Sequence, residues 1–218
     1  MPIEILIVDD HSPIIEGYKS ILSFTEENHI LHFTEARNCE TAYNILSDAK
    51  NHFDVVFLDV SIPAYEKLNL FSGEQLIPHI REHKPKAKII VLTSHTEHFL
   101  LYSIYKKFRP ESIMIKSDFT PNEFLDAFKE VISGNEYYSQ TVREAIKKIA
   151  AYYAVLDGID MQIIILLADG IQSKSLTSHL SLGKSAIDKR KQKIKEFFKI
   201  DKGNDEDIIR EAKKQNII

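Results

Sequence analysis

Three short, uninterrupted apolar runs constrain the fold of this chain more than any other feature. They cover residues 5–8, 55–58 and 89–92, and they contain only Val, Ile, Leu and Phe. Strands buried on both faces have this character, whereas strands with one wet face alternate apolar and polar side chains. Longer stretches with a helical apolar period separate the runs. The pattern therefore predicts a parallel β-sheet with helices on both faces.

Strands and helices are expected to alternate over the first 135 residues. The strands are predicted at residues 3–8, 30–36, 54–59, 88–92 and 112–115. The helices are predicted at residues 13–24, 39–49, 73–83, 97–108 and 121–133. Thr120, Pro121 and Glu123 are typical of a capped helix start, and Gly134 is typical of a helix end. This order predicts an α/β fold, a (βα)5 doubly wound parallel sheet with right-handed crossovers.

The strand pattern ends near residue 157, and short helices follow. They are predicted at residues 160–168, 173–179, 184–198 and 205–215, with glycine-containing breaks between them. Residues 136–155 have helical character and are predicted to form a linker helix. We therefore expect an α/β domain at 1–135, the linker at 136–155 and a small all-α domain at 156–218.

Composition excludes several classes of protein. The 218 residues include a single cysteine, Cys39, which excludes a disulfide framework and a cysteine metal site. The first ten residues have no basic leader of the secretory type. The longest apolar run, 163–168, is too short to cross a bilayer. A cytoplasmic protein with no membrane partner is expected.

Acids and one lysine stand where the predicted strands end. Asp9 and Asp10 follow the first strand, Asp59 ends the third, Thr93 follows the fourth and Lys116 follows the fifth. Ligand sites in such sheets lie at the carboxyl ends of the strands. Clustered carboxylates favour a hard cation such as Mg²⁺, and a cation with an ammonium group can stabilise a transferring phosphoryl group. A carboxylate can itself be the nucleophile, so the set predicts phosphoryl transfer to an aspartate.

The sequences around these residues resemble the receiver domain of response regulators over roughly residues 3–135. They read ILIVDDH from Ile5, VVFLDVSIP from Val55, VLTS from Val91 and IMIK from Ile113. The resemblance implies a flavodoxin-like receiver fold, with Asp59 as phosphoacceptor and Thr93 and Lys116 as its partners. The Mg²⁺ ligands that it implies are Asp9, Asp10, Asp59 and the backbone carbonyl of Ser61.

Two features depart from the usual receiver pattern. Ile113 stands three positions before the lysine, where receivers usually carry an aromatic switch residue. The signal that this residue normally transmits is therefore either weakened or carried by other residues. The segment 64–72 after Asp59 is long, and it is either a partner-recognition or lid element or, as we favour, a tolerated surface insertion. The histidines beyond His11 show no spacing of metal ligands, and no zinc site is expected.

The C-terminal part resembles the LuxR-type helix-turn-helix of the NarL/FixJ class of regulators. The similar pieces are residues 163–170, 173–180 and 182–187. Residues 184–199 hold seven basic and two acidic residues, which is either a solvated helix face or a footprint for nucleic acid. The residues expected to meet DNA are Lys174, Lys184, Ser185, Asp188, Lys189, Lys191, Gln192 and Lys193.

The helix-turn-helix resemblance is weaker than that of the receiver. Asp157-Gly-Ile-Asp160 replaces the usual Thr-Pro-Arg-Glu opening. Asp188 stands where the family normally has a lysine, and it would repel phosphate or accept a hydrogen bond from a cytosine amine.

On a helical wheel of residues 184–198, Ile187, Ile194 and Phe198 share the face that should pack inward.

Together the two parts predict a response regulator of a two-component system, and not an enzyme. A histidine kinase would phosphorylate Asp59, and the receiver would free or dimerise a module that binds double-stranded DNA and controls transcription. One alternative is a receiver used as a protein-interaction switch, with a helix-turn-helix that does not bind DNA. A dehalogenase-like phosphatase is disfavoured because its second acid lies two residues after the nucleophile, where this chain has Ser61.

Overall fold

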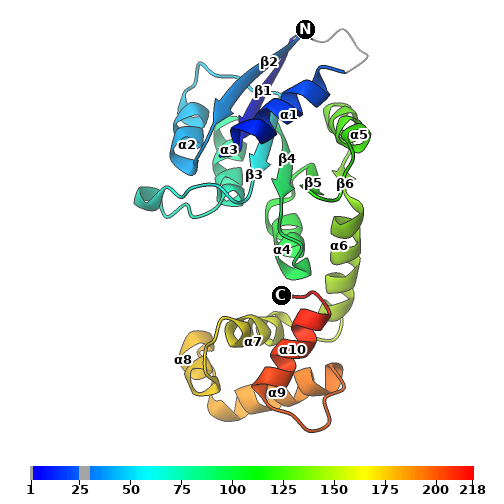
Figure 1. The fold of residues 1–218 in the computed structure, drawn as a ribbon. Coiled ribbons are helices and arrows are strands. Elements are labelled where there is room, and N and C mark those ends of the chain that lie inside the picture. The colour runs from blue at the N-terminus through cyan, green and yellow to red at the C-terminus, as the bar shows by residue number, and fades with distance from the viewer. Residues whose placement is uncertain (1, 25–29) are drawn as a thin grey trace. The chain divides into compact units, whose positions relative to one another are not determined.

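The computed structural model describes residues 2–24 and 30–218, and Figure 1 shows their fold. Contacts divide the chain into two compact units, residues 1–95 with 103–143 and residues 96–102 with 144–218. The domain boundaries predicted after residues 135 and 155 stay predictions.

The first unit contains a six-stranded parallel sheet in the order β2-β1-β3-β4-β5-β6. Its strands are β1 (Ile3–Val8), β2 (Leu31–Ala36), β3 (Val55–Asp59), β4 (Lys88–Thr93), β5 (Ser112–Ile115) and β6 (Tyr137–Tyr138). The five predicted strands and their parallel pairing are confirmed. β6 was not predicted, because residues 136–139 were expected to begin a helix. Its two tyrosines pair with the edge of β5 instead, and helix α6 runs Gln140–Tyr153.

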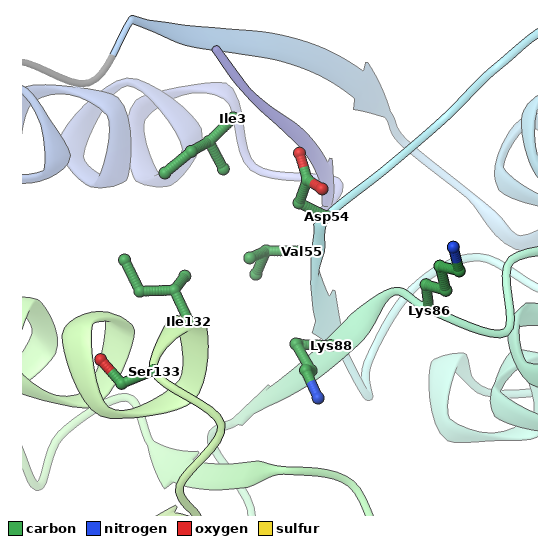
Figure 2. Close-up of a pocket in the computed structure, with 7 residues that line it drawn as sticks. All are labelled: Ile3, Asp54, Val55, Lys86, Lys88, Ile132 and Ser133. Carbon is green, nitrogen blue, oxygen red and sulfur yellow. The ribbon is translucent and has the colours of Figure 1, made fainter. Parts of the chain in front are cut away.

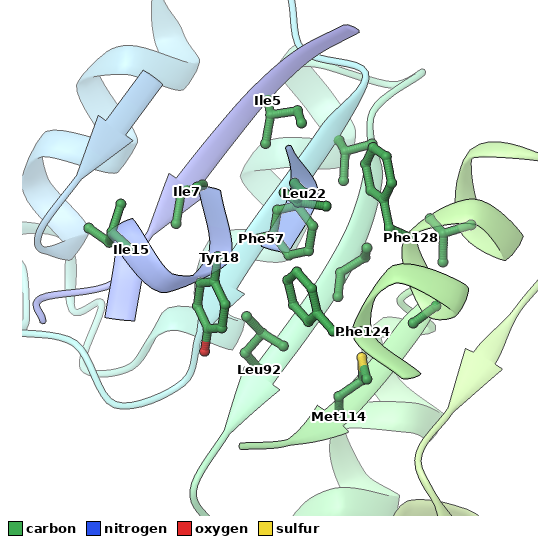
Figure 3. Close-up of a cluster of buried hydrophobic side chains, with 14 residues drawn as sticks. Ile5, Ile7, Ile15, Tyr18, Leu22, Phe57, Leu92, Met114, Phe124 and Phe128 are labelled. Atoms are coloured by element: carbon green, nitrogen blue, oxygen red, sulfur yellow. The ribbon is translucent and has the colours of Figure 1, made fainter. Parts of the chain in front are cut away.

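Helices cover both faces of this sheet, as the continuous apolar runs predicted. The helices α1 (Ser12–Leu22) and α5 (Pro121–Ile132) lie on one face, and α2 (Cys39–Ser47) and α3 (Ile77–His83) lie on the other (Figure 1). Alternate strand residues such as Ile5, Ile7 and Phe57 pack toward α1 and α5 (Figure 3). Each large apolar side chain buried in this way contributes roughly 1.5–3 kcal/mol.

A stack of aromatic rings ties α1 and α5 to the sheet. The ring centroid of Tyr18 on α1 lies 5.0 Å from that of Phe124 on α5, and Phe124 lies 5.3 Å from Phe57 on β3 (Figure 3). Phe128 continues the stack, with its centroid 6.2 Å from that of Phe57. These contacts fix α1 and α5 over the strands whose ends carry the acids.

Local sequence signals set the helix ends. The Asn38 side chain accepts the Thr41 N–H at the start of α2. Thr120 and Glu123 form the predicted capping box at the start of α5. The predicted helix at 73–83 is divided into a 3-10 turn, Gly73–Leu76, and α3, because Pro78 near the start of α3 has no N–H to continue the helix. Helix α4 runs His98–Phe108.

The second unit contains the short helices predicted after residue 157. They are α7 (Gly158–Ala168), the 3-10 turn Ser173–Ser175 continued by α8 (Leu176–Leu180), α9 (Lys184–Phe197) and α10 (Asp205–Lys214). Ile187, Ile194 and Phe198 are buried, which confirms the predicted inward face of α9. Among the described residues, no single helix could cross a membrane by length and apolar content, although α6 and α7, bent by 115°, pass that test as a pair.

Candidate functional site

The predicted acids and lysine gather at the carboxyl edge of the sheet. Asp9 follows β1, Asp59 ends β3, Thr93 ends β4 and Lys116 follows β5. Asp9, Asp59 and Thr93 are 1%, 2% and 0% exposed. Asp59 pairs in register with the residue before Thr93 on the neighbouring strand. Residues up to 107 positions apart in sequence therefore share one buried site.

Lys116 joins the two buried carboxylates. Its Nζ lies 2.7 Å from Asp9 Oδ2 and 2.7 Å from Asp59 Oδ2. Burial disfavours the charged ammonium, but hydrogen bonds to Asp59 and Asp9 outweigh this effect, so the pKa of Lys116 is raised above its ordinary value. The Lys116 backbone N–H also donates to the Thr93 carbonyl at 2.7 Å. The ammonium group is thus fixed, charged and aimed at the Asp59 carboxylate.

Polar groups on the two adjoining loops complete the surroundings of Asp59. The Ser61 N–H donates to Asp59 Oδ1 at 3.1 Å, and the His95 N–H donates to Thr93 Oγ1 at 3.0 Å. Ser61 Oγ and His95 Nε2 lie 3.2 Å apart. Sequence reasoning included Ser61 but missed His95, whose signal is its place two residues after the strand-ending threonine.

A glycine is required beside the Asp59 backbone. The Gly73 N–H donates to the Val60 carbonyl at 2.9 Å. A Cβ on Gly73 would stand 1.9 Å from the Asp59 carbonyl oxygen, so no other residue fits without movement of Asp59 or the following turn. The segment 64–72 lies just before this glycine, and Tyr65 and Leu70 close it as an antiparallel bridge.

The acid cluster has the chemistry of a divalent cation site. Asp9, Asp10, His11 and Asp59 each offer a ligand atom within 4.8 Å of the others. Asp10 Oδ1 lies 2.6 Å from His11 Nδ1, and the His11 N–H donates to Asp9 Oδ1 at 2.9 Å. Three carboxylates against one ammonium leave net negative charge in the cluster. That donor set fits a hard, oxygen-seeking ion of the Mg²⁺ type.

A cavity of about 390 Å³ at the opposite end of the strands has a different lining. Asp54, the residue before β3, lines it together with Lys86 and Lys88 (Figure 2). The Asp54 carboxylate is already engaged, because its Oδ2 accepts the Glu4 N–H at 2.9 Å. The cavity therefore brings no group of carboxylates together, and the chemistry of the sheet belongs to the carboxyl edge.

The position where receivers usually carry the aromatic residue is occupied here by a buried aliphatic side chain. Ile113 is fully buried and pairs in register with Tyr138 of β6. The Tyr138 ring meets Tyr105 of α4 edge-on, with centroids 5.5 Å apart and planes at 87°. Burial, reinforced by the nearby Glu136 carboxylate, raises the pKa of Tyr138. An aromatic pair thus lies beside β5, although neither ring comes from that strand.

The residues predicted to meet DNA fall into two groups. One group is exposed and lies on α9 or on the 3-10 turn before α8; its members are Lys174, Lys184, Ser185, Asp188, Lys189 and Gln192. The other group, Lys191 and Lys193, is held by acids of its own unit. Lys191 Nζ lies 2.5 Å from Asp205 Oδ1, and Lys193 Nζ lies 2.7 Å from Asp160 Oδ2.

Asp160 is the centre of an ionic network that sequence reasoning missed. Its side chain is 0% exposed and lies 2.7 Å from both Arg190 and Lys193. Asp157 also binds Arg190, at 2.7 Å, and forms a capping box with Asp160. The altered opening Asp157–Asp160 therefore anchors α9 to the start of α7, and the signal for it was the spacing of the two acids.

Comparison with known proteins agrees with this geometry. The response regulator receiver domain family model matches residues 5–117. The oxygen regulatory protein NreC of Staphylococcus epidermidis is 23% identical over 202 residues, covering 88% of each chain. The response regulator protein VraR of the same species is 24% identical over 182 residues, covering 82% of this chain and 81% of VraR.

Solved structures share the fold. RcsB of Salmonella enterica serovar Typhimurium, bound to promoter rprA in the presence of phosphomimetic BeF3-, matches with a TM-score of 0.68 and 22% identity, covering 96% of this chain and 98% of that one. A structure of two RcsB dimers bound to two parallel DNAs matches with a TM-score of 0.67 and 20% identity, covering 98% of each chain.

Proposed function

The chain belongs to the response regulator receiver family, and on that premise we propose that it is a phosphorylation-dependent transcriptional regulator in which Asp59 accepts the phosphoryl group. The observation that carries this proposal is the Lys116 ammonium, which lies 2.7 Å from both the Asp9 and Asp59 carboxylates in a buried site. A buried lysine between two acids supports a reaction in which charge builds up on the Asp59 carboxylate.

Phosphoryl transfer follows from this arrangement. A carboxylate oxygen of Asp59 attacks the phosphorus of a phosphohistidine on a sensor kinase. The P–O bond forms as the P–N bond breaks, and the histidine nitrogen leaves with the bonding electron pair and takes up a proton. Lys116 then pairs with the added negative charge, and the Thr93 hydroxyl donates to a phosphoryl oxygen. Asp9, Asp10, Asp59 and the Ser61 carbonyl would hold Mg²⁺, which supplies charge neutralisation when bound.

Phosphoryl uptake from a small phosphodonor in Mg²⁺ tests this assignment. We expect Asp59→Asn to abolish labelling, because an amide is not a nucleophile here. Asp54→Asn is the matched control, since it removes the acid directly before the other end of the same strand, and it should label like the wild type. Equal labelling of the wild type and Asp59→Asn would refute the assignment.

We further propose that the exposed face of α9 contacts double-stranded DNA as part of a homodimer in the cytoplasm. Lys184 and Lys189 would meet phosphates, while Ser185, Asp188 and Gln192 would face base edges, with Lys174 at the flank. A dimer would place two such helices about one turn of DNA apart. Lys191 and Lys193, which pair with Asp205 and Asp160, would mainly hold α9 in place.

The salt dependence of DNA affinity separates this proposal from a protein-interaction switch. If Lys189 contacts a phosphate, Lys189→Ala should lower the slope of log affinity against log salt by about one. Lys107→Ala, which removes an exposed lysine of α4, should leave the slope unchanged. Absence of DNA binding at low salt, with a folded protein, would favour the protein-interaction alternative.

A further inference from the structure

A pair of histidines lies on α3, a helix on the face of the sheet opposite α1 and α5 (Figure 1). His79 and His83 are four residues apart on α3, the spacing that places two side chains on one helix face. The His79 ring stacks on Tyr43 of α2, with centroids 3.9 Å apart and planes at 14°. The His83 ring also contacts the His79 ring, with centroids 4.0 Å apart and planes at 40°. The expectation that the histidines lack ligand spacing does not hold for this pair.

Hydrogen bonds assign the protons of both rings. Ser47 Oγ donates its one hydrogen to the Tyr43 carbonyl at 2.8 Å, so it accepts from His79 Nε2, which lies 3.0 Å away. His83 Nδ1 lies 3.1 Å from the His79 carbonyl, which can only accept, so Nδ1 carries the proton there. The lone pairs of the neutral rings are therefore on His79 Nδ1 and His83 Nε2.

A carboxylate completes a set of three donors. Glu82 is exposed on the same turn of α3, and ligand atoms of His79, Glu82 and His83 all lie within 4.8 Å of one another. Donors bound to one tetrahedral zinc ion stand roughly 3.3 Å apart, from bond lengths of about 2.0–2.1 Å. Glu82 and His83 are exposed, so the Glu82 side chain has room to turn toward an ion, and a tilt of the His83 ring about its Nδ1 hydrogen bond would close the remaining distance and keep the His79 carbonyl as its partner.

From this geometry we propose that His79, Glu82 and His83 form a binding site for a divalent late transition-metal ion of the zinc type. Two imidazole nitrogens and one carboxylate oxygen suit Zn²⁺, Ni²⁺ or Cu²⁺ rather than Mg²⁺, which prefers oxygen. Ser47 and the His79 carbonyl hold the non-ligating nitrogens, as the outer partners of metal-bound histidines do. The site leaves one tetrahedral position for water, and it uses none of the residues of the acid cluster.

Binding of Zn²⁺ to the full chain, in excess Mg²⁺ so that the acid cluster is not the preferred site, tests the proposal. Nitrogen-15 NMR of the histidine side chains should show that Zn²⁺ shifts Nδ1 of His79 and Nε2 of His83. By titration against a chromophoric chelator, His83→Gln should weaken Zn²⁺ affinity at least about tenfold. His179→Gln, which removes an exposed histidine of α8, should bind like the wild type.

A second variant keeps the test independent of the ligands themselves. Ser47→Ala removes the partner of His79 Nε2 without touching a ligand, and it should weaken Zn²⁺ affinity roughly tenfold while circular dichroism stays unchanged. Zinc affinity that is equal in the wild type and His83→Gln would overturn the proposal. So would zinc shifts confined to His11, with affinity lost in Asp10→Asn, because they would place the ion in the acid cluster.

Discussion

Lys116 neutralises two carboxylates that are almost completely buried, and its removal has a predictable cost. Lys116→Met leaves Asp9 and Asp59 facing each other without a cation, which we expect to lower the free energy of unfolding by about 3 kcal/mol in the absence of divalent ions. If the cluster binds Mg²⁺, the ion replaces the ammonium, and the loss should shrink in its presence. Urea unfolding with and without Mg²⁺ measures both values, and an identical loss in the two conditions would contradict the proposed metal site.

The Asp59 backbone lies so close to residue 73 that only glycine fits there. Gly73→Ala forces a Cβ to within 1.9 Å of the Asp59 carbonyl oxygen unless the turn moves. We expect a destabilisation of about 1–3 kcal/mol and slower phosphoryl uptake. Gly17→Ala on α1 is the control, because its Cβ meets nothing within 4 Å and should stabilise the helix by roughly 0.5–1 kcal/mol. Similar effects of the two substitutions on unfolding would show that the contact does not matter.

At the scale of elements, Asp160 joins α7 to α9. Asp160→Ala removes the buried partner of Lys193, one of the two acids that bind Arg190 and one half of the capping box, so we expect the second unit to lose about 1–3 kcal/mol. Asp188→Ala removes an exposed acid from α9 itself and should change stability by less than about 0.5 kcal/mol. Thermal or urea unfolding monitored in the second unit compares the two, and a loss below 1 kcal/mol for Asp160→Ala, on the order of a single neutral hydrogen bond, would argue against the network.

The contact between α9 and α10 makes the second unit sensitive to acid. Burial opposes the charge on Asp205, but Lys191 and the Ser173 hydroxyl outweigh it and hold the pKa of Asp205 below its ordinary value. A carboxyl with a lowered pKa stabilises the fold above its unfolded pKa of about 3.9, and this contribution is lost as pH falls through the folded pKa. The stability of the wild type should therefore fall more steeply below pH ~4 than that of Asp205→Asn. Parallel pH profiles would contradict this prediction.

The elements themselves were largely predictable because burial on both faces leaves a plain apolar signature. The strands β1, β3 and β4 follow from it, whereas the inward face of α9 follows from its helical apolar period. β6 was not predictable in this way, since Tyr137 and Tyr138 form a strand only because the edge of β5 is open beside them. The split before α3 depended on one proline, Pro78, whose effect on a helix start varies with its exact position.

For the molecule as a whole, the carboxyl-edge site was predictable because strand order gathers strand ends. The ion-pair partners of the charged side chains were not predictable, because these pairs form between residues that are distant in sequence. The seven basic residues of 184–199 indicate one cationic surface when the sequence is considered alone. In the structure, however, Arg190, Lys191 and Lys193 pair with acids of α7 and α10. The exposed face of α9 consequently carries less free positive charge than the sequence of residues 184–199 indicates.

Phosphorylation of Asp59 is expected to control DNA binding by the second unit. The most direct test is DNA affinity, with the operator first selected from random sequences, measured with and without a phosphodonor for the wild type and Asp59→Asn. We predict that the phosphodonor changes the affinity of the wild type by at least about fivefold, the scale of a 1 kcal/mol coupling, and leaves Asp59→Asn unchanged. An equal change in both proteins, or no change in a wild type shown to be phosphorylated, would contradict the account.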